Sequence, residues 1–170
     1  MLNPFRKSKD RRKFAESLCA ALTTRARGPE FFARLGVADT IDGRFDLVAL
    51  HAFLVLERLN AQGARDLAQD VTDHLFTGFD EALRDLGVGD MGLGPRMKKF
   101  ANAFYGRMQA YGVAANENEL AEAILRNVYR GDEANAGAAR KLAAYVWQAR
   151  AQLEQNDLTK EPPNFGVPLL

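Results

Sequence analysis

Four glycines within the segment "LGVGDMGLGPRMKKF", residues 86–100, are the first feature of the sequence that could carry chemistry. Gly87, Gly89 and Gly92 match G-x-G-x-x-G, the fingerprint of dinucleotide-binding loops. That fingerprint needs a strand before the glycines and a helix N-terminus after them. Here a helical pattern leads into the glycines, and no Walker lysine–serine pair follows Gly94. We therefore reject a nucleotide site.

Candidate metal ligands are scattered along the chain. His51 and His74 each lack a second ligand at helical spacing, so neither indicates a metal site. His51 lies within an apolar segment, and we expect a buried histidine that is satisfied by a hydrogen bond. Asp66, Asp70 and Asp73 share one helix face, but three exposed acids without fixed neighbours make a weak site. The sequence predicts no metal, no cofactor and no catalytic residue.

The composition is that of a folded domain. The chain has 170 residues, of which 47% are hydrophobic and 26% charged, with a net charge of +1. These values predict one domain with its own core and give no general attraction to DNA. The single cysteine, Cys19, stands among apolar residues and is expected in the core. The longest apolar run, "FDLVALHAFLVL", is shorter than the ~20 residues that span a bilayer.

Apolar residues recur at helical spacing along most of the chain, which predicts an all-α bundle of about six to seven helices. We expect Ser8 to cap a first helix and a short helix to run from Pro29 to Gly36. An apolar central helix is predicted from Phe45 to about Ala61, with "IDGRF" before it as a loop. An amphipathic helix follows over residues 66–86.

The glycine-rich segment is predicted to be an ordered loop between two helices. Gly87 stands where a left-handed C-terminal cap is expected, and Pro95 suits the first position of the next helix. The residues assigned to this loop are Gly87, Gly89, Gly92, Gly94 and Pro95. The next helix has an apolar stripe that we expect to be buried, namely Met97, Phe100, Ala101, Phe104, Met108 and Tyr111.

The two ends of the chain differ from its middle. Asn116 and Glu119 form a capping-box pattern, and Asp132 suits the start of a last long helix. Two adjacent prolines near the C-terminus predict a tail that is either draped on the body or disordered. We divide the chain into a basic arm (1–13), an all-α domain (14–156) and a C-terminal tail (157–170).

The basic arm has three competing interpretations. It could be a solvated run of charge, a contact for anionic lipid or RNA, or a degenerate import sequence. Each basic residue near an anionic bilayer contributes about 1 kcal/mol, enough in sum for reversible attachment. The residues concerned are Arg6, Lys7, Lys9, Arg11, Arg12 and Lys13.

Positive charge is also concentrated after Pro95. Arg96, Lys98 and Lys99 fall in the first turn of the predicted helix, where the helix dipole disfavours cations. Gly106 inside the same helix costs about 1 kcal/mol relative to alanine. A helix that accepts both costs indicates a partner surface, with Asp90 as the counter-charge that holds the turn.

At these residues the sequence also carries a resemblance. "FDLVALHAFLVLERL" and "LRDLGVGDMGLGPRMKKFANAFYGRMQAYG" resemble the ubiquinol–cytochrome c chaperone family, the assembly factors of the cytochrome bc1 complex. The resemblance covers roughly residues 31–145. Its motif falls on Arg84, Gly87, Gly89, Asp90, Met97, Lys98, Phe104, Tyr105, Gly106 and Arg107.

The resemblance implies a helical, non-enzymatic domain that binds newly made cytochrome b at the membrane and, in mitochondria, near the ribosome exit. It leaves open a co-chaperone and a ribosome contact. Since no mitochondrial presequence is recognised, we expect a bacterial member, cytoplasmic and peripheral at the inner face of the cytoplasmic membrane. In a eukaryote the corresponding place is the mitochondrial inner membrane or matrix. The partner-binding residues predicted are Asp90, Arg96, Lys98, Lys99, Tyr105 and Arg107.

Two other classes of function remain open from the sequence. One is a small enzyme that uses the acidic helix face or the glycine-rich loop, and the other is a ribosome- or RNA-contacting module. A groove with an apolar floor and a basic rim favours the chaperone. A deep pocket that encloses Asp90 or His51 favours the enzyme.

Overall fold

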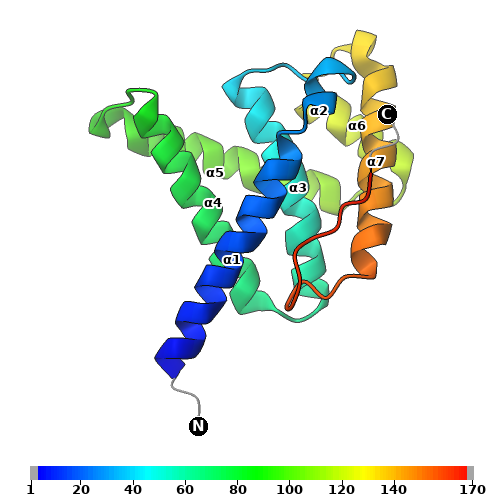
Figure 1. Ribbon diagram of the computed structural model, residues 1–170. Coiled ribbons are helices and arrows are strands. Elements are labelled where there is room, and N and C mark those ends of the chain that lie inside the picture. The colour runs from blue at the N-terminus through cyan, green and yellow to red at the C-terminus, as the bar shows by residue number, and fades with distance from the viewer. Residues whose placement is uncertain (1–3, 168–170) are drawn as a thin grey trace.

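The computed structural model describes the backbone of residues 4–167 and the side chains from Lys7 onward. This part of the chain is all-α, without a β-strand, as predicted (Figure 1). Its elements are α1 (Pro4–Ala26), α2 (Pro29–Ala33), α3 (Ile41–Ala61), α4 (Arg65–Asp85), α5 (Asp90–Gly112), α6 (Glu117–Asn127), a short 3₁₀ turn η1 (Glu133–Asn135) and α7 (Ala136–Glu154).

The apolar helix α3 is the centre of the fold. It packs against α1, α4 and α5 on one side and against α7 on the other, while α6 packs on α7. Every side chain from Phe45 to Val55 is buried. The tip formed by the end of α4 and the start of α5 projects away from this body (Figure 1). The end of α4 and the start of α5 therefore lie away from the core.

Capping residues set several helix boundaries. The Thr40 hydroxyl accepts the Gly43 N–H at 3.1 Å and starts α3. Asn116 and Glu119 form the predicted capping box, with the Glu119 N–H donating to Asn116 Oδ1 at 3.0 Å. Gly87 has φ +80° and closes α4, because its N–H and that of Val88 donate back to carbonyls of the last turn.

Two predicted helix starts were wrong. Helix α1 begins at Pro4 rather than after Ser8, so the described part of the basic arm is helical. Helix α3 begins at Ile41, and "IDGRF" forms its first turns rather than a loop. Gly43 in that turn is required sterically, since a Cβ there would lie 1.9 Å from the carbonyl oxygen of Ala38. The Asp-Gly pair therefore serves close packing, not a turn.

The extent of the glycine-rich loop was also wrong. Only residues 86–89 connect α4 to α5, and Gly92, Gly94 and Pro95 lie inside α5. The Gly89 carbonyl accepts the N–H groups of Gly92 and Leu93, which starts the helix five residues before Pro95. Leu93 is buried and extends the apolar stripe of α5 toward its N-terminus. Burial of Leu93 offsets the poor helix propensity of glycine and proline in this turn.

The predicted core is largely as expected. Leu50, Phe53, Leu54 and Leu75 are buried, whereas Phe79 is only half-buried. In the stripe predicted to be buried on α5, Phe104 and Tyr111 are buried, but Met97, Phe100, Ala101 and Met108 are only partly buried. The described part of the C-terminal tail is draped on the body, since Leu158 and Phe165 are buried. The Asn156 carbonyl accepts hydrogen bonds from Arg58 of α3 and from Gln62 just after that helix, and these bonds hold the start of the tail.

Candidate partner-binding site

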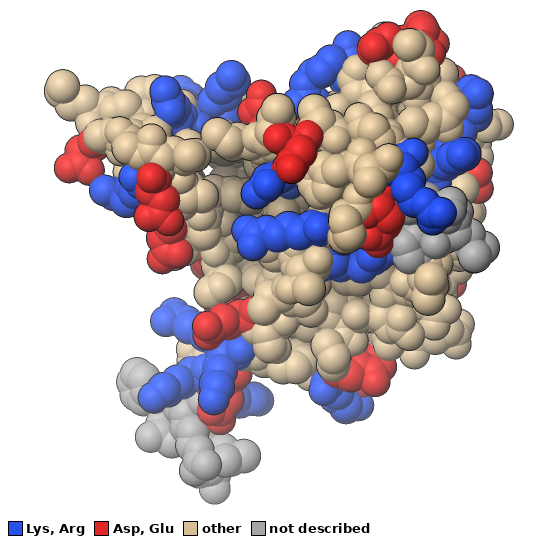
Figure 2. Space-filling view, turned by 45° about the horizontal axis from the view of Figure 1, so that its top comes forward, with Lys and Arg blue, Asp and Glu red and all other residues tan. Residues whose placement is uncertain are grey.

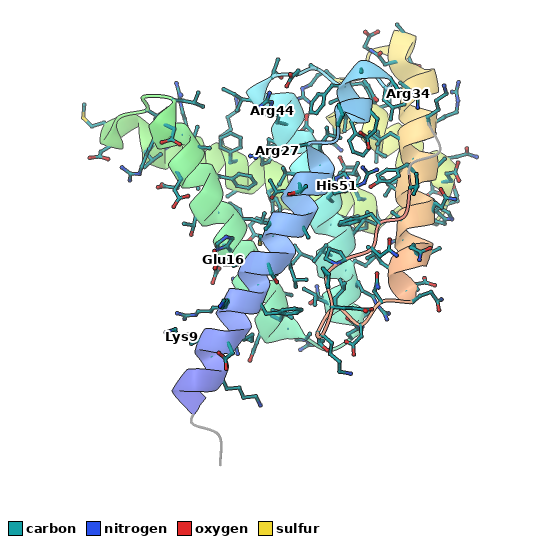
Figure 3. All side chains as sticks on the ribbon, viewed as in Figure 1. Lys9, Glu16, Arg27, Arg34, Arg44 and His51 are labelled. Carbon is teal, nitrogen blue, oxygen red and sulfur yellow. The ribbon has the colours of Figure 1, made fainter. Side chains whose placement is uncertain are left out.

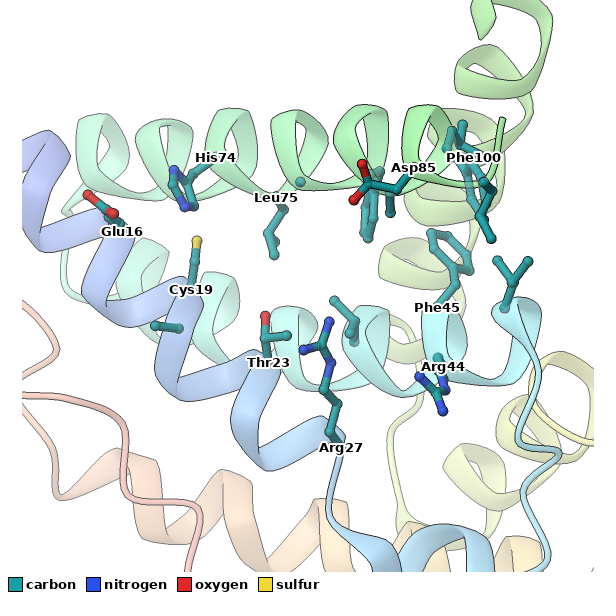
Figure 4. A pocket seen from close by; sticks show the side chains of 18 residues that line it. Glu16, Cys19, Thr23, Arg27, Arg44, Phe45, His74, Leu75, Asp85 and Phe100 are labelled. Atoms are coloured by element: carbon teal, nitrogen blue, oxygen red, sulfur yellow. The ribbon is translucent and has the colours of Figure 1, made fainter. Parts of the chain in front are cut away.

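An open groove lies where α1 and α4 diverge. Its volume is about 610 Å³. One wall is α1, the other is α4, and the first turns of α3 close the floor together with Phe100 of α5 (Figure 4). The lining is mainly apolar; its apolar members are Cys19, Ala20, Ile41, Phe45, Val48, Leu75, Phe79, Ala82, Leu83, Leu86 and Phe100.

Three aromatic rings form the wide end of the floor. The rings of Phe45 and Phe100 lie 4.9 Å apart, and Phe79 stacks on Phe100 at 5.9 Å. Phe79 and Phe100 are each only partly buried. Both residues line the groove, so the exposed parts of their rings face it. The groove therefore exposes aromatic surface that the fold itself leaves uncovered.

Charged side chains stand at the rim of the groove. Arg27 and Arg44 lie on one side, with Glu16, His74 and Asp85 elsewhere along the edge (Figures 3 and 4). Arg44 pairs with Asp39 at 2.7 Å, and both side chains are more than half exposed. On the face shown in Figure 2, Lys and Arg side chains gather beside the hollow. The rim is thus mixed in charge, with two arginines at one side of the opening.

The described part of the chain offers little reactive chemistry. His51 is fully buried, with Nδ1 2.7 Å from the Leu47 carbonyl and Nε2 2.9 Å from the Tyr145 hydroxyl. Burial lowers its pKa to about 4. Burial likewise raises the pKa of the Cys19 thiol to about 12, although Cys19 lines the groove. No group of side chains suited to a metal occurs among the described residues.

The three aspartates considered as metal ligands have other neighbours. Asp66 and Asp70 both bind Arg11, at 3.2 and 2.5 Å, and this pairing fastens α1 to α4. Asp73 accepts a hydrogen bond from Gln69. Three exposed acids were expected from the sequence, but the Asp70 side chain is only 11% exposed because it packs against Arg11 between the two helices.

The residues of α5 that were predicted to form one site have different surroundings in the structure. Arg96, Lys98 and Lys99 are exposed, and no carboxylate lies within 4 Å of them in the described chain. Asp90 is not their counter-charge, because its carboxylate pairs with Arg84 of α4 at 2.9 Å. Tyr105 is 56% exposed and stacks on Phe76.

Arg107 is revised from a surface residue to a structural one. Its guanidinium lies 2.5 Å from Asp46, which is completely buried in α3, and its side chain is only 12% exposed. Arg130 reaches the same carboxylate from the other side at 2.8 Å. Burial raises the pKa of Asp46, and the two guanidinium groups oppose that rise. This cluster was not predicted. The single aspartate in the apolar segment "FDLVALH" does indicate it, because a buried carboxylate needs a cation as its partner.

Most of the described basic residues near the start of α1 are exposed to solvent. Lys7, Lys9, Arg12 and Lys13 are exposed, while Arg11 is held by the α4 aspartates. At 100° per residue, Lys9, Arg12 and Lys13 fall on the side of α1 that also carries Glu16 (Figure 3). The side chain of Arg6 lies outside the described residues.

Comparison with known proteins shows the family of the chain. The sequence pattern of the ubiquinol-cytochrome C chaperone family matches residues 33–160, about three quarters of the chain. The chain belongs to this family. The match includes the floor of the groove, its α4 wall and the whole of α5.

Two similar proteins place the chain within the family. The ubiquinol-cytochrome-c reductase complex assembly factor 1 of Xenopus laevis is 22% identical over 129 residues, which cover 74% of this chain. Those residues span 63% of the Xenopus protein, less than two thirds of its length. The crystal structure of the Cbp3 homolog from Brucella abortus is 38% identical, with a TM-score of 0.76, over 89% of this chain and 86% of that one.

Proposed function

We propose that this protein is an assembly chaperone of the ubiquinol–cytochrome c reductase complex that binds newly made cytochrome b. The observation that carries the proposal is the open groove with its uncovered aromatic floor. Exposed apolar surface of this kind marks a site for an apolar ligand or partner. Membership of the chaperone family and the name of the Xenopus assembly factor supply the identity of the complex.

The groove suits a segment that is destined for the membrane. Such a segment is apolar along most of its length, and each Å² that it removes from water contributes about 25 cal/mol. The groove is open rather than enclosed, so a segment still attached to a longer chain can enter it from the side. Arg27 and Arg44 at the rim favour a segment flanked by acidic or carbonyl groups.

We further propose that the protein works in the cytoplasm at the inner face of the cytoplasmic membrane. No helix in the described range is both long enough and apolar enough to cross a bilayer. The exposed cations on α1 supply the means of a peripheral contact with anionic lipid. Ribosomal RNA is the competing partner for the same cations.

The enzyme hypothesis finds less support in the geometry. It required a deep pocket around His51 or Asp90, but His51 is sealed in the core and the Asp90 side chain is exposed at the tip. The groove instead brings together apolar rings and a thiol whose pKa is raised rather than lowered. A reactive thiol would need the opposite shift.

Gly78 provides a direct test of the groove. It lies in α4 on the groove wall, and a side chain added there meets nothing within 4 Å. Gly78→Glu should place a charge on the apolar wall and lower the amount of cytochrome b that co-purifies with the tagged protein about tenfold. Assembled reductase complex should fall with it, while the melting temperature does not fall.

Gly137→Glu is the matched control. Gly137 is also helical, exposed and surrounded by open space, but it lies on α7, away from the groove. Capture of cytochrome b should equal that of the unmodified protein. Unchanged capture by both Gly78→Glu and the bulkier Gly78→Trp would remove the groove from the function.

A further inference from the structure

The outward face of α5 differs from an ordinary solvated helix face. The charged residues of this face are Lys98 and Lys99, whereas the exposed Asp90 and Arg96 of the same helix lie to either side of it. By contrast, the exposed side of α4 carries Asp66, Asp73, Glu81 and Asp85. The exposed residues of this α5 face are Met91, Gly94, Pro95, Lys98, Lys99, Asn102, Tyr105, Gly106, Gln109 and Gly112.

Apolar side chains are unusually exposed along this face. Met91 is 97% exposed at its start, Tyr105 is 56% exposed at its middle and Val113 is 71% exposed just beyond its end. Met91, Lys98 and Tyr105 are spaced by seven residues and therefore lie in one line along the helix. The Tyr105 ring is fixed by its stacking on Phe76 of α4, with ring centroids 6.1 Å apart. The face thus presents a positioned aromatic side chain and a free methionine to solvent.

The fold gives no reason for the small residues on this face. A Cβ added at Gly94 or Gly106 would meet no atom within 4 Å. Each glycine inside a helix costs about 1 kcal/mol relative to alanine, and both keep ordinary helical backbone. Small side chains beside exposed apolar ones allow the backbone of another helix to approach closely.

The two lysines determine which charged groups a partner on this face must carry. Neither has a carboxylate within 4 Å in the described chain, so covering them would remove two ammonium groups from water without compensation. That cost is offset only if the partner supplies acidic groups at this point. From Met91 to Val113 the face is about 33 Å long, at 1.5 Å per residue.

We propose that the outward face of α5 binds a helix of another protein, with acidic side chains opposite Lys98 and Lys99 and apolar side chains opposite Tyr105. A bilayer is the less suitable occupant, since two lysines give little attraction to anionic lipid at about 1 kcal/mol each. The site is separate from the groove and does not depend on what the groove holds.

Site-specific photo-cross-linking tests this assignment in the full-length protein. A benzophenone side chain replaces Asn102, which lies in the middle of the face, or Gln148 on the exposed side of α7 as the control position. Cross-linking is done in intact cells that produce the reductase complex, and adducts are mapped to peptides by mass spectrometry. We expect an adduct at Asn102, absent at Gln148, whose peptide is helical and has an Asp or Glu within one turn of the joined residue.

Charge reversal then tests whether the cross-linked partner is bound through the two lysines or only lies near them. Lys98→Glu with Lys99→Glu should lower the Asn102 adduct about tenfold, and changing the mapped carboxylate of the partner to lysine should restore it. Lys141→Glu, at an exposed lysine of α7, should have no effect. An adduct with lipid, RNA or a second copy of this chain would overturn the proposal. An adduct whose peptide has no carboxylate, or an adduct no stronger than at the control position, would also overturn it.

The two proposals fail independently. If Gly78→Glu abolishes capture of cytochrome b while the α5 charge reversal changes no adduct, the groove function stands and the α5 site falls. If the Asn102 adduct forms and depends on the lysines while Gly78→Glu leaves capture unchanged, the reverse holds.

Discussion

At the scale of single residues, the core contains a polar chain that ends at a neutral histidine. Arg25 Nε donates to the Tyr145 hydroxyl at 3.0 Å, and this hydroxyl in turn donates to His51 Nε2. Nδ1–H of His51 then donates to the Leu47 carbonyl. Both ring nitrogens are used in the neutral form, so protonation would place an unsolvated charge in the core and oppose the hydrogen bond from Tyr145.

This arrangement predicts a specific loss of stability in mild acid. The pKa of His51 falls from 6.5 to about 4 on folding, so the unfolded chain binds the proton more tightly. Stability from this residue is complete above pH 6.5 and is lost as the pH falls toward 4. At pH 5 we expect a loss of about 2 kcal/mol. Urea unfolding at pH 7.5 and pH 5 measures it.

His51→Gln should weaken this pH dependence, while His74→Gln on the exposed side of α4 should leave it intact. An identical pH dependence in all three proteins would contradict the assignment. Burial of His51 was predictable from its apolar neighbours in sequence. Its bond to Tyr145 was not, because 94 residues separate the two and only the packing of α7 on α3 brings them together. The same holds for Asp46 and its two arginines.

At the scale of elements, the short connection between α4 and α5 fixes where the tip points. Gly87 requires a left-handed backbone at φ +80°, whereas Gly89 has φ −69° and suits most residues. The Arg84 side chain joins the two helices by pairing with Asp80 and Asp90. The connection is therefore held by one glycine and one arginine.

The two glycines should respond differently to substitution. Gly87→Ala should lower the free energy of unfolding by about 1–2 kcal/mol, since alanine is strained in the left-handed region. Gly89→Ala should change it little, because a Cβ there meets nothing within 4 Å. Thermal or urea unfolding of both variants makes the comparison. Equal losses would show that the connection is constrained along its whole length.

The helical class of each segment could be read from the sequence, but the starts of α1, α3 and α5 could not. Pro95 was interpreted as the first residue of a helix because proline is common there. In the structure the extra turn before it is stabilised by the buried Leu93 and by Asp90, whose charge suits a helix N-terminus. These contributions depend on α4 lying beside the turn, and periodicity within α5 alone does not contain them.

At the scale of the whole molecule, the proposed membrane contact rests on three exposed cations that share one side of α1. Reversing three of them, Lys9→Glu, Arg12→Glu and Lys13→Glu, keeps the Arg11 clamp to α4. Binding to vesicles that contain phosphatidylserine should fall about 100-fold, at about 1 kcal/mol per cation. Sedimentation with vesicles measures it.

The salt dependence of vesicle binding tests whether the attachment is electrostatic. Binding of the unmodified protein should fall as the salt concentration rises, since the Debye length shortens from about 10 Å at 0.1 M to about 3 Å at 1 M. Arg140→Glu with Lys141→Glu on α7 is the matched control and should bind as the unmodified protein does. Binding that ignores salt, or equal losses in both variants, would contradict an electrostatic attachment.

The groove itself was beyond sequence reasoning. Its walls come from two helices that are separated in sequence by the whole of α2 and α3, and each wall alone has the pattern of an ordinary amphipathic helix. Only the divergence of α1 from α4 leaves Phe79 and Phe100 uncovered. Periodicity predicts which side of a helix faces the core, but not where the core is left open.

The C-terminal tail carries a kinetic consequence. Phe165 packs edge-on against the ring of His51, with centroids 5.2 Å apart, and Leu158 is fully buried near the end of α3. Contacts this distant in sequence close a long loop, which costs entropy and slows their formation. During synthesis, α3 emerges long before residue 165 and remains uncovered on this side until the tail arrives. Each new copy of the protein therefore passes through an immature period in which its own central helix is exposed.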